Sequence, residues 1–198
     1  MGPTRSSASR ELAEGVAMGA LFMAFFGAIW AAAGASALDG ATGVVLLIVS
    51  VALAAVLCLG AVRLRRSARG LSRDDSPQAR EQQKHVSRRF NLVFGLQGIA
   101  IALAVVLLGR YGLGSFIPAA VALIVGVHFF PLARLYGVRV YHVTGAVMCV
   151  IALVALLLAP ASRLPFVGLG SATTLFVTSA YVLLFLGGKV MRSSPPTA

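Results

Sequence analysis

Residues 116–135 read FIPAAVALIVGVHFFPLARL, a run of twenty residues whose only charged side chain is the arginine next to its end. About 20 mainly apolar residues are needed for a helix to cross the roughly 30 Å hydrocarbon core of a bilayer. The run is continuously apolar, whereas a strand of a membrane barrel alternates over about ten residues. The stretch therefore predicts a transmembrane helix that contains a histidine, His128, and a proline, Pro131.

The rest of the chain repeats this pattern. Of its 198 residues, 59% are hydrophobic and 12% are charged, whereas soluble domains are roughly 45 to 50% apolar. The mean hydropathy is +0.91. We therefore predict an all-α, polytopic membrane bundle that forms one integral membrane domain over residues 1–198. It has six spans, at about 12–33, 43–62, 90–108, 116–135, 140–159 and 166–186.

Short connections between successive spans indicate three helical hairpins. The letters LIVSV at 47–51 in the second span resemble LIVGV at 123–127 in the fourth, which suggests that the hairpin is repeated along the chain. Small residues predict where helices approach closely: Ala122 with Gly126 on the fourth span, and Gly98 with Ala102 on the third.

Basic residues predict which way the helices point. Lys and Arg accumulate in short cytoplasmic loops, and fifteen of the seventeen fall inside if the N-terminus is cytoplasmic. The two exceptions, Arg110 and Arg163, are placed in outer loops. We therefore expect both termini in the cytoplasm.

The loop at 63–89 carries nine basic and three acidic residues. It contains no aromatic residue before Phe90, so it lacks the stacking groups of a nucleic-acid surface, and we expect no nucleic-acid partner. Ser76 followed by Pro77 predicts that the third helix begins in the cytoplasm, before its membrane span. The residues expected to fix topology or to contact anionic lipid headgroups are Arg63, Arg65, Arg66, Arg69, Arg88, Arg89 and Arg134.

Polar side chains within the spans are the candidate functional residues, because an unpaired polar group costs several kcal/mol in lipid. Gln97 and His128 are each seven residues from the cytoplasmic edge of their predicted span, about 10 Å deep, so they lie level. This geometry favours a polar cavity open toward the cytoplasm. The full candidate set is Glu14, Asn91, Gln97, His128, His142 and Thr144.

His128 admits three interpretations. It is a packing residue, hydrogen-bonded to Gln97 or to a neighbouring carbonyl, or a protonatable group whose partner is Glu14, or a haem or metal ligand. Pro131 cannot donate to the carbonyl of Val127, so we expect a kink there that forms a polar notch beside the imidazole.

Catalytic patterns are not found in the sequence. No paired carboxylates, no serine with a nearby base and no phosphate-binding glycine loop can be placed at one depth, and no zinc-type spacing occurs. We expect a non-enzymatic membrane protein without a cofactor. Transport of a small solute or of protons is the first hypothesis. A structural or accessory subunit is the alternative, and an oligomer or a partner subunit is compatible with either role.

The segments RFNLVFGLQG at 89–98, GVHFFPLA at 126–133 and YHVTG at 141–145 resemble small, uncharacterised bacterial integral membrane proteins that carry an HFxPLA-type segment. This resemblance covers most of the last four spans. It implies a bacterial inner membrane and no particular reaction.

Overall fold

The computed structural model describes residues 5–69 and 76–188, and within these residues the chain is entirely helical. Six helices follow one another, with a 3-10 turn before the fourth and a π-helical continuation of the sixth. They are α1 (Arg5–Ala35), α2 (Gly40–Ala68), α3 (Pro77–Arg110), η1 (Gly114–Phe116), α4 (Ile117–Tyr136), α5 (Val140–Leu156), α6 (Pro160–Tyr181) and η2 (Val182–Gly187). The predicted all-α class is confirmed.

Five of these helices are long and apolar enough to cross a membrane, with spans at 13–35, 40–68, 84–110, 114–136 and 160–187. Helix α5 is equally apolar but has 17 residues, which is about 26 Å of helix. The described residues thus form a helical membrane bundle with five long candidate spans and one shorter apolar helix.

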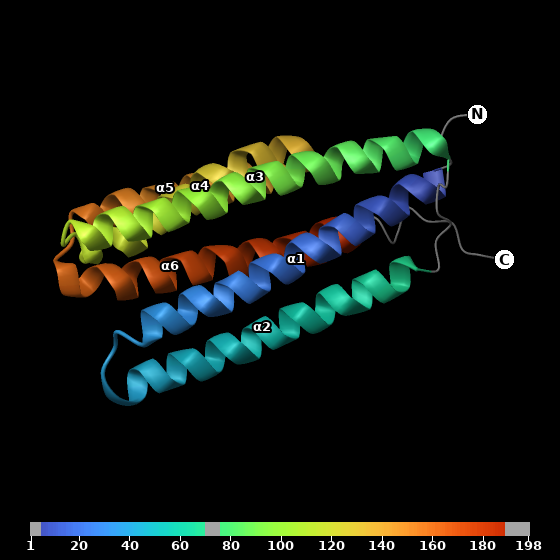
Figure 1. Cartoon of the computed structure of the whole chain (residues 1–198). Helices are drawn as coiled ribbons and strands as arrows, with labels where there is room; N and C mark the ends of the chain where they lie inside the picture. The colour runs from blue at the N-terminus through green and yellow to red at the C-terminus, as the bar shows by residue number, and fades with distance from the viewer. Residues whose placement is uncertain (1–4, 70–75, 189–198) are drawn as a thin grey trace.

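Helix α1 lies at the centre of the bundle, packed against α2 on one side and α6 on the other. Helix α6 contacts α5, which packs closely against α4, and α4 contacts α3. Helices α2 and α3, although consecutive, lie on opposite sides of the molecule (Figure 1). The contacts α1–α2, α3–α4 and α5–α6 match the predicted hairpins, while the sequence repeat between them remains a prediction.

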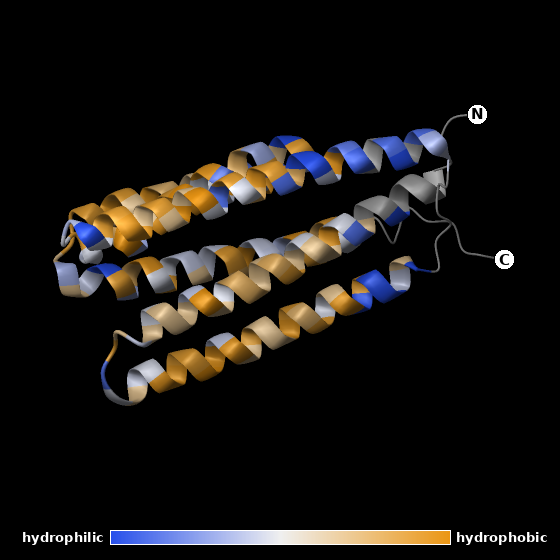
Figure 2. Ribbon diagram, in the orientation of Figure 1, coloured by the Kyte–Doolittle hydropathy of each residue, from blue (hydrophilic) through white to orange (hydrophobic). Residues whose placement is uncertain are grey.

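One end of the bundle is hydrophilic. Figure 2 shows polar residues at the end of α2 and the start of α3, and mainly hydrophobic residues along the middle of the helices. We call this the basic end, since Arg63 to Arg69 of α2 and Arg80 to Arg89 of α3 lie there. The start of α1 and the end of η2 lie there too. Ala13 packs with Ala68, and a Cβ atom on Gly187 would lie 2.9 Å from Leu64.

The observed helix boundaries confirm one prediction and correct another. Helix α3 begins at Pro77, as Ser76-Pro77 predicts. Helix α6 begins at Pro160 rather than at residue 166, so Arg163 lies in its first turn and not in an outer loop. Ala159 is extended, and Pro160 has the backbone angle that suits a first helical position, so the helix begins there despite the charge three residues later.

Close helix contacts are made where glycines face each other. A Cβ atom on Gly145 of α5 would lie 2.6 Å from the carbonyl oxygen of Gly126 on α4, and one on Gly168 of α6 would lie 2.5 Å from Gly34 on α1. The predicted close approach at Gly126 is therefore confirmed. The one at Gly98 is wrong, because no atom lies within 4 Å of a Cβ atom placed there.

Candidate functional site

A cavity with a volume of about 970 Å³ lies between α1, α3 and α4. Tyr141 of α5 and Leu164 and Leu175 of α6 complete its wall. Its size falls within the usual range for small-molecule sites, roughly 300 to 1,000 Å³. The cavity exists because α3 stands away from α1. No residue in the most apolar stretch of α3 is buried, and the helix that α3 contacts most is α4.

An aromatic layer joins α1, α3 and α4 across this cavity. Phe22 of α1 has its ring centroid 6.4 Å from those of both Phe90 and Phe94 on α3, and Phe90 lies 6.4 Å from Tyr136 on α4. These rings lie on the basic-end side of the cavity, since Phe90 precedes Gln97 by seven residues and Tyr136 ends α4.

Gln97 and His128, predicted to lie level, face the same cavity from α3 and α4. The His128 ring packs edge-on against Phe94, with centroids 6.3 Å apart. Gln97 Oε1 and His128 Nδ1 are both buried without a hydrogen-bond partner.

Buried polar atoms in native proteins are nearly always hydrogen-bonded, so these two atoms are exceptions. Each has almost no accessible surface, so neither atom is itself open to the cavity. The third orphan among the described residues, Ser171 Oγ on α6, is not a lining residue of this cavity. The polar groups of the cavity wall are Ser87, Asn91, Gln97, His128, Tyr136 and Tyr141. The described lining residues include no Asp, Glu, Lys or Arg.

Three other sequence candidates lie outside the cavity wall. Glu14 forms an ion pair with Arg10 one turn earlier on α1, at 3.0 Å, so it is not placed as a partner of His128. Thr144 makes a buried 2.7 Å hydrogen bond with Thr178 of α6, which joins α5 to α6. His142 is half-buried, and its ring lies 5.9 Å from that of Phe130.

Asn91 is exposed and contributes to the cavity wall near the aromatic layer. Pro131 lies within α4, which continues through it to Tyr136. The side chains of Pro131 and Val127 are both exposed, whereas those of Phe129 and Leu132 line the cavity. The predicted kink and polar notch beside His128 stay a prediction. The cavity also reaches further from the basic end than expected, to Ala33 and Pro118.

The basic residues predicted at the cytoplasmic surface are all exposed: Arg63, Arg65, Arg66, Arg69, Arg88 and Arg89 at the basic end, and Arg134 in the last turn of α4. Within the described residues, no group of three or more His, Cys, Asp or Glu side chains is placed to hold a metal ion.

Arg163 is the polar residue whose position the sequence does not reveal. It is 8% exposed, its Nε donates to the carbonyl of Leu158 at 3.2 Å, and an Nη donates to Ser115 Oγ at 2.8 Å. Its guanidinium also lies 3.9 Å from the centroid of the Phe116 ring. Arg163 thereby clamps the turn before α6 to the turn before α4, at the end opposite the basic end. Pro160 is the sequence signal for this position, because it predicts that the helix begins before Arg163.

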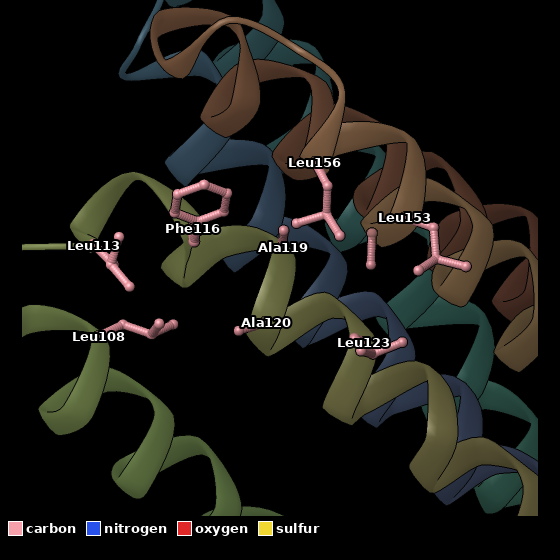
Figure 3. A pocket seen from close by; sticks show the side chains of 9 residues that line it. Leu108, Leu113, Phe116, Ala119, Ala120, Leu123, Leu153 and Leu156 are labelled. Carbon is pink, nitrogen blue, oxygen red and sulfur yellow. The ribbon is translucent and has the colours of Figure 1, made fainter. Parts of the chain in front are cut away.

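A second, smaller cavity of about 380 Å³ lies near that clamp, between the end of α3, η1, α4 and α5. Figure 3 shows Leu108, Leu113, Phe116 and Leu123 around it. Its described lining residues are leucine, alanine and phenylalanine only. This cavity therefore offers space to an apolar group but no hydrogen bond.

Comparison with known proteins places most of this site in a shared segment. Residues 90–185 match a family of unknown function, DUF7010. The matched segment includes Gln97, His128 and Arg163 but excludes α1 and α2. No curated protein and no solved structure matches the chain. The chain is thus similar, from the aromatic layer of α3 to η2, to a family of unknown function.

Proposed function

We propose that this chain is a non-enzymatic integral membrane protein that binds and carries a small, mainly apolar solute in the cavity between α1, α3 and α4. The observation that carries the proposal is a cavity of about 970 Å³ whose mainly apolar wall includes the side chains of Gln97 and His128. Ligand sites combine such an apolar wall with a few placed polar groups.

Transport of protons or metal cations is less well supported by the same wall. A proton path through a membrane uses chains of Asp, Glu and His, and cation sites use carboxylates or carbonyl rings. The described lining residues contain one histidine and no carboxylate, and Glu14 is paired with Arg10. We therefore put a small organic solute before an ion.

The proposal includes six membrane crossings with both ends in the cytoplasm of a bacterial inner membrane. Helix α5 is about 26 Å long and runs between α4 and α6, which are both long enough to cross. The basic end then faces the anionic lipids of the cytoplasmic leaflet. The HFxPLA-type resemblance supports the bacterial membrane.

The topology is tested by single cysteines in a chain whose Cys58 and Cys149 are replaced. An impermeant reagent added to intact cells should label a cysteine at Asp39 or Ser162, at exposed turns opposite the basic end. It should leave a cysteine at Ser67, exposed at the end of α2, unlabelled until the cells are opened. External labelling at Ser67 would contradict the orientation.

The transport proposal is tested in proteoliposomes with a panel of small solutes and a pH-sensitive dye inside. We expect flux of an apolar or amphipathic solute, which His128→Ala abolishes while the protein remains folded in detergent. Leu96→Ala, on the exposed side of α3, is the matched control and should retain flux.

A structural or accessory subunit is the second candidate, and the exposure of α3 favours it. A helix with no buried residue in its most apolar stretch offers a free face to a partner helix. Two results together would favour this role over transport. No solute shows flux, and a partner co-migrates with the native protein but is lost after substitutions on the exposed face of α3.

A further inference from the structure

The wall of the cavity has a buried side and an exposed side. Phe129 of α4 and Leu175 of α6 line it and are 7% and 2% exposed, whereas Phe26 and Ile29 of α1 line it and are 37% and 48% exposed. Helix α1 packs against α2 and α6, and α3 packs against α4, but α1 and α3 do not pack closely against each other. The cavity is therefore backed by α4 and α6 and is least enclosed between α1 and α3.

Aromatic rings close one part of this exposed side. The rings of Phe22, Phe90 and Phe94 join α1 to α3 near the basic end. Ile29 follows Phe22 by seven residues and Ile101 follows Phe94 by seven, and both helices run away from the basic end, so both isoleucines lie about 10 Å beyond the rings. Both line the cavity, and both are aliphatic. We call the part of the wall between Ile29 and Ile101 the lateral opening.

The lateral opening lies at the depth of the hydrocarbon of a bilayer. Helices α1 and α3 are both candidate membrane spans, over residues 13–35 and 84–110. Ile29 is six residues from the far end of its span and Ile101 is nine from the far end of its own, or about 9 and 14 Å. The medium that meets the opening is therefore lipid chains of the leaflet opposite the basic end, and neither water nor headgroups.

The wall behind the opening suits hydrocarbon. Beyond Gln97 and His128 its described residues are aliphatic or aromatic, as far as Ala33 of α1 and Pro118 of α4. Apolar cavities in proteins stay dry and bind apolar molecules. A hydrocarbon chain that enters gains dispersion contacts that an empty wall lacks, and it needs no hydrogen bond. This part of the cavity therefore favours a lipid chain over water or an ion.

We infer that one hydrocarbon chain of a bilayer lipid, from the leaflet opposite the basic end, enters the cavity sideways through the lateral opening and lies beside Trp30. The inference rests on the proposed binding function, and it adds the class of the ligand and its route of entry.

Trp30 is a built-in reporter for this chain. It is the only tryptophan of the protein, it lines the cavity, and it packs against core residues of α2, α4, α5 and α6, which shield much of its ring. Bromine on a lipid chain quenches an indole only at short range, so strong quenching requires a chain inside the cavity. Trp30 lies five residues before the end of α1, about 8 Å, which is the depth of the upper part of a chain in that leaflet.

The test measures tryptophan fluorescence of the full chain in nanodiscs of phosphatidylcholine brominated in the upper part of its acyl chains, relative to the unbrominated lipid. The reference for lipid at the outer surface is Trp30→Phe combined with Leu103→Trp, because Leu103 is exposed on α3 and does not line the cavity. We expect Trp30 to be quenched at least half as strongly as this reference. Weaker quenching would show that lipid chains stay outside the cavity and would overturn the inference.

The position of the bromine tests the leaflet. Lipid brominated at the ends of its chains should quench Trp30 less than lipid brominated in the upper part, because a chain from the far leaflet has its end near the middle of the bilayer. Equal or stronger quenching by the chain ends would mean that the chain comes from the basic-end leaflet, and would overturn the route.

Variants at the rim test the lateral opening itself. Ile29→Phe and Ile101→Phe place larger side chains on its two sides and should each lower the quenching of Trp30 about twofold, since less of the wall remains open to a chain. Leu103→Phe adds a ring elsewhere on α3 and is the matched control, with quenching unchanged. If neither rim variant lowers the quenching, the chain does not enter between α1 and α3.

The proteoliposome flux assay separates this inference from the proposed function. Flux of a solute with Trp30 shielded from brominated lipid would leave the proposed function standing and overturn the lipid chain. Quenching that the rim variants reduce, without flux of any solute, would support the lipid chain and contradict transport.

Discussion

Helix α4 meets its two neighbours in different ways. Toward α5, Gly126 and Gly145 bring the backbones into contact, and nearby Thr144 is fully hydrogen-bonded. Toward α3, the contact is made by the rings of His128 and Phe94, and the cavity opens beside them. Toward α5 the backbones touch and the threonine has partners, whereas toward α3 two buried polar atoms lack partners. In membrane bundles small residues and interhelical hydrogen bonds hold helices together, so we expect the α5 side to contribute more stability than the cavity side.

The largest effect is expected where two backbones touch. Gly145→Leu places a side chain against the Gly126 carbonyl and Phe129, so α5 must move away from α4. We expect a loss of about 3 kcal/mol of unfolding free energy, measured by denaturant titration in mixed micelles.

The matched control lies on the other side of the comparison. A Cβ atom at Gly98 of α3 would have no atom of another helix within 4 Å, so Gly98→Leu should change the unfolding free energy by less than about 0.5 kcal/mol. If both glycine variants behave alike, the contrast between the two sides of α4 is wrong.

The next largest effect is expected for Arg163, which clamps the turn before α6 to the turn before α4 at the end opposite the basic end. Arg163→Leu removes two charge-assisted hydrogen bonds and leaves Ser115 and the Leu158 carbonyl without this donor. We expect a loss of about 2 kcal/mol in the same titration. Arg110→Leu, at the exposed end of α3, should have almost no effect, and a comparable loss there would show that charge rather than the clamp is responsible.

The two sides of α4 also differ in how far the sequence predicts them. Hydrophobic runs near twenty residues long predict the helices, and the pairing of Ala122 with Gly126 predicts a close contact, because periodicity and residue size are local properties. The level of Gln97 and His128 follows from counting residues to the membrane edge. These predictions require no knowledge of which helices are neighbours.

The remaining features depend on tertiary packing. Gly98 has the same spacing signal as Gly126, but α3 stands away from the other helices, so no neighbour uses it. The aromatic layer joins Phe22 to Phe90 and Phe94 across helices far apart in sequence, which no spacing rule predicts. The sequence prediction placed Arg163 in a loop, because a charged residue lowers the local hydropathy more than Pro160 signals a helix start. In the structure its guanidinium is buried but donates hydrogen bonds to two turns.

A smaller effect is expected from the hydrogen bond beside the glycine contact. Thr144→Val removes the 2.7 Å bond to Thr178 while it keeps the side-chain shape. Interhelical hydrogen bonds in membrane proteins contribute about 0.6 kcal/mol on average, so we expect a loss of this size. A double-mutant cycle with Thr178→Val measures the coupling. Strict additivity would show that the bond contributes nothing to stability.

The smallest change in stability, with the opposite sign, is expected in the cavity itself. Gln97 Oε1 and His128 Nδ1 lack partners, so replacing either side chain by an apolar one of similar size removes a burial cost and breaks no bond at that atom. Gln97→Leu should therefore leave the unfolding free energy unchanged or raise it by up to about 1 kcal/mol in the ligand-free protein. His128→Phe should act in the same way. The measurement is the same denaturant titration, with Thr144→Val as the reference for a polar group that does have a partner. If Gln97→Leu lowers the unfolding free energy by more than about 1 kcal/mol, the amide stabilises the fold as Thr144 does. The two sides of α4 would then not differ in their contribution to stability.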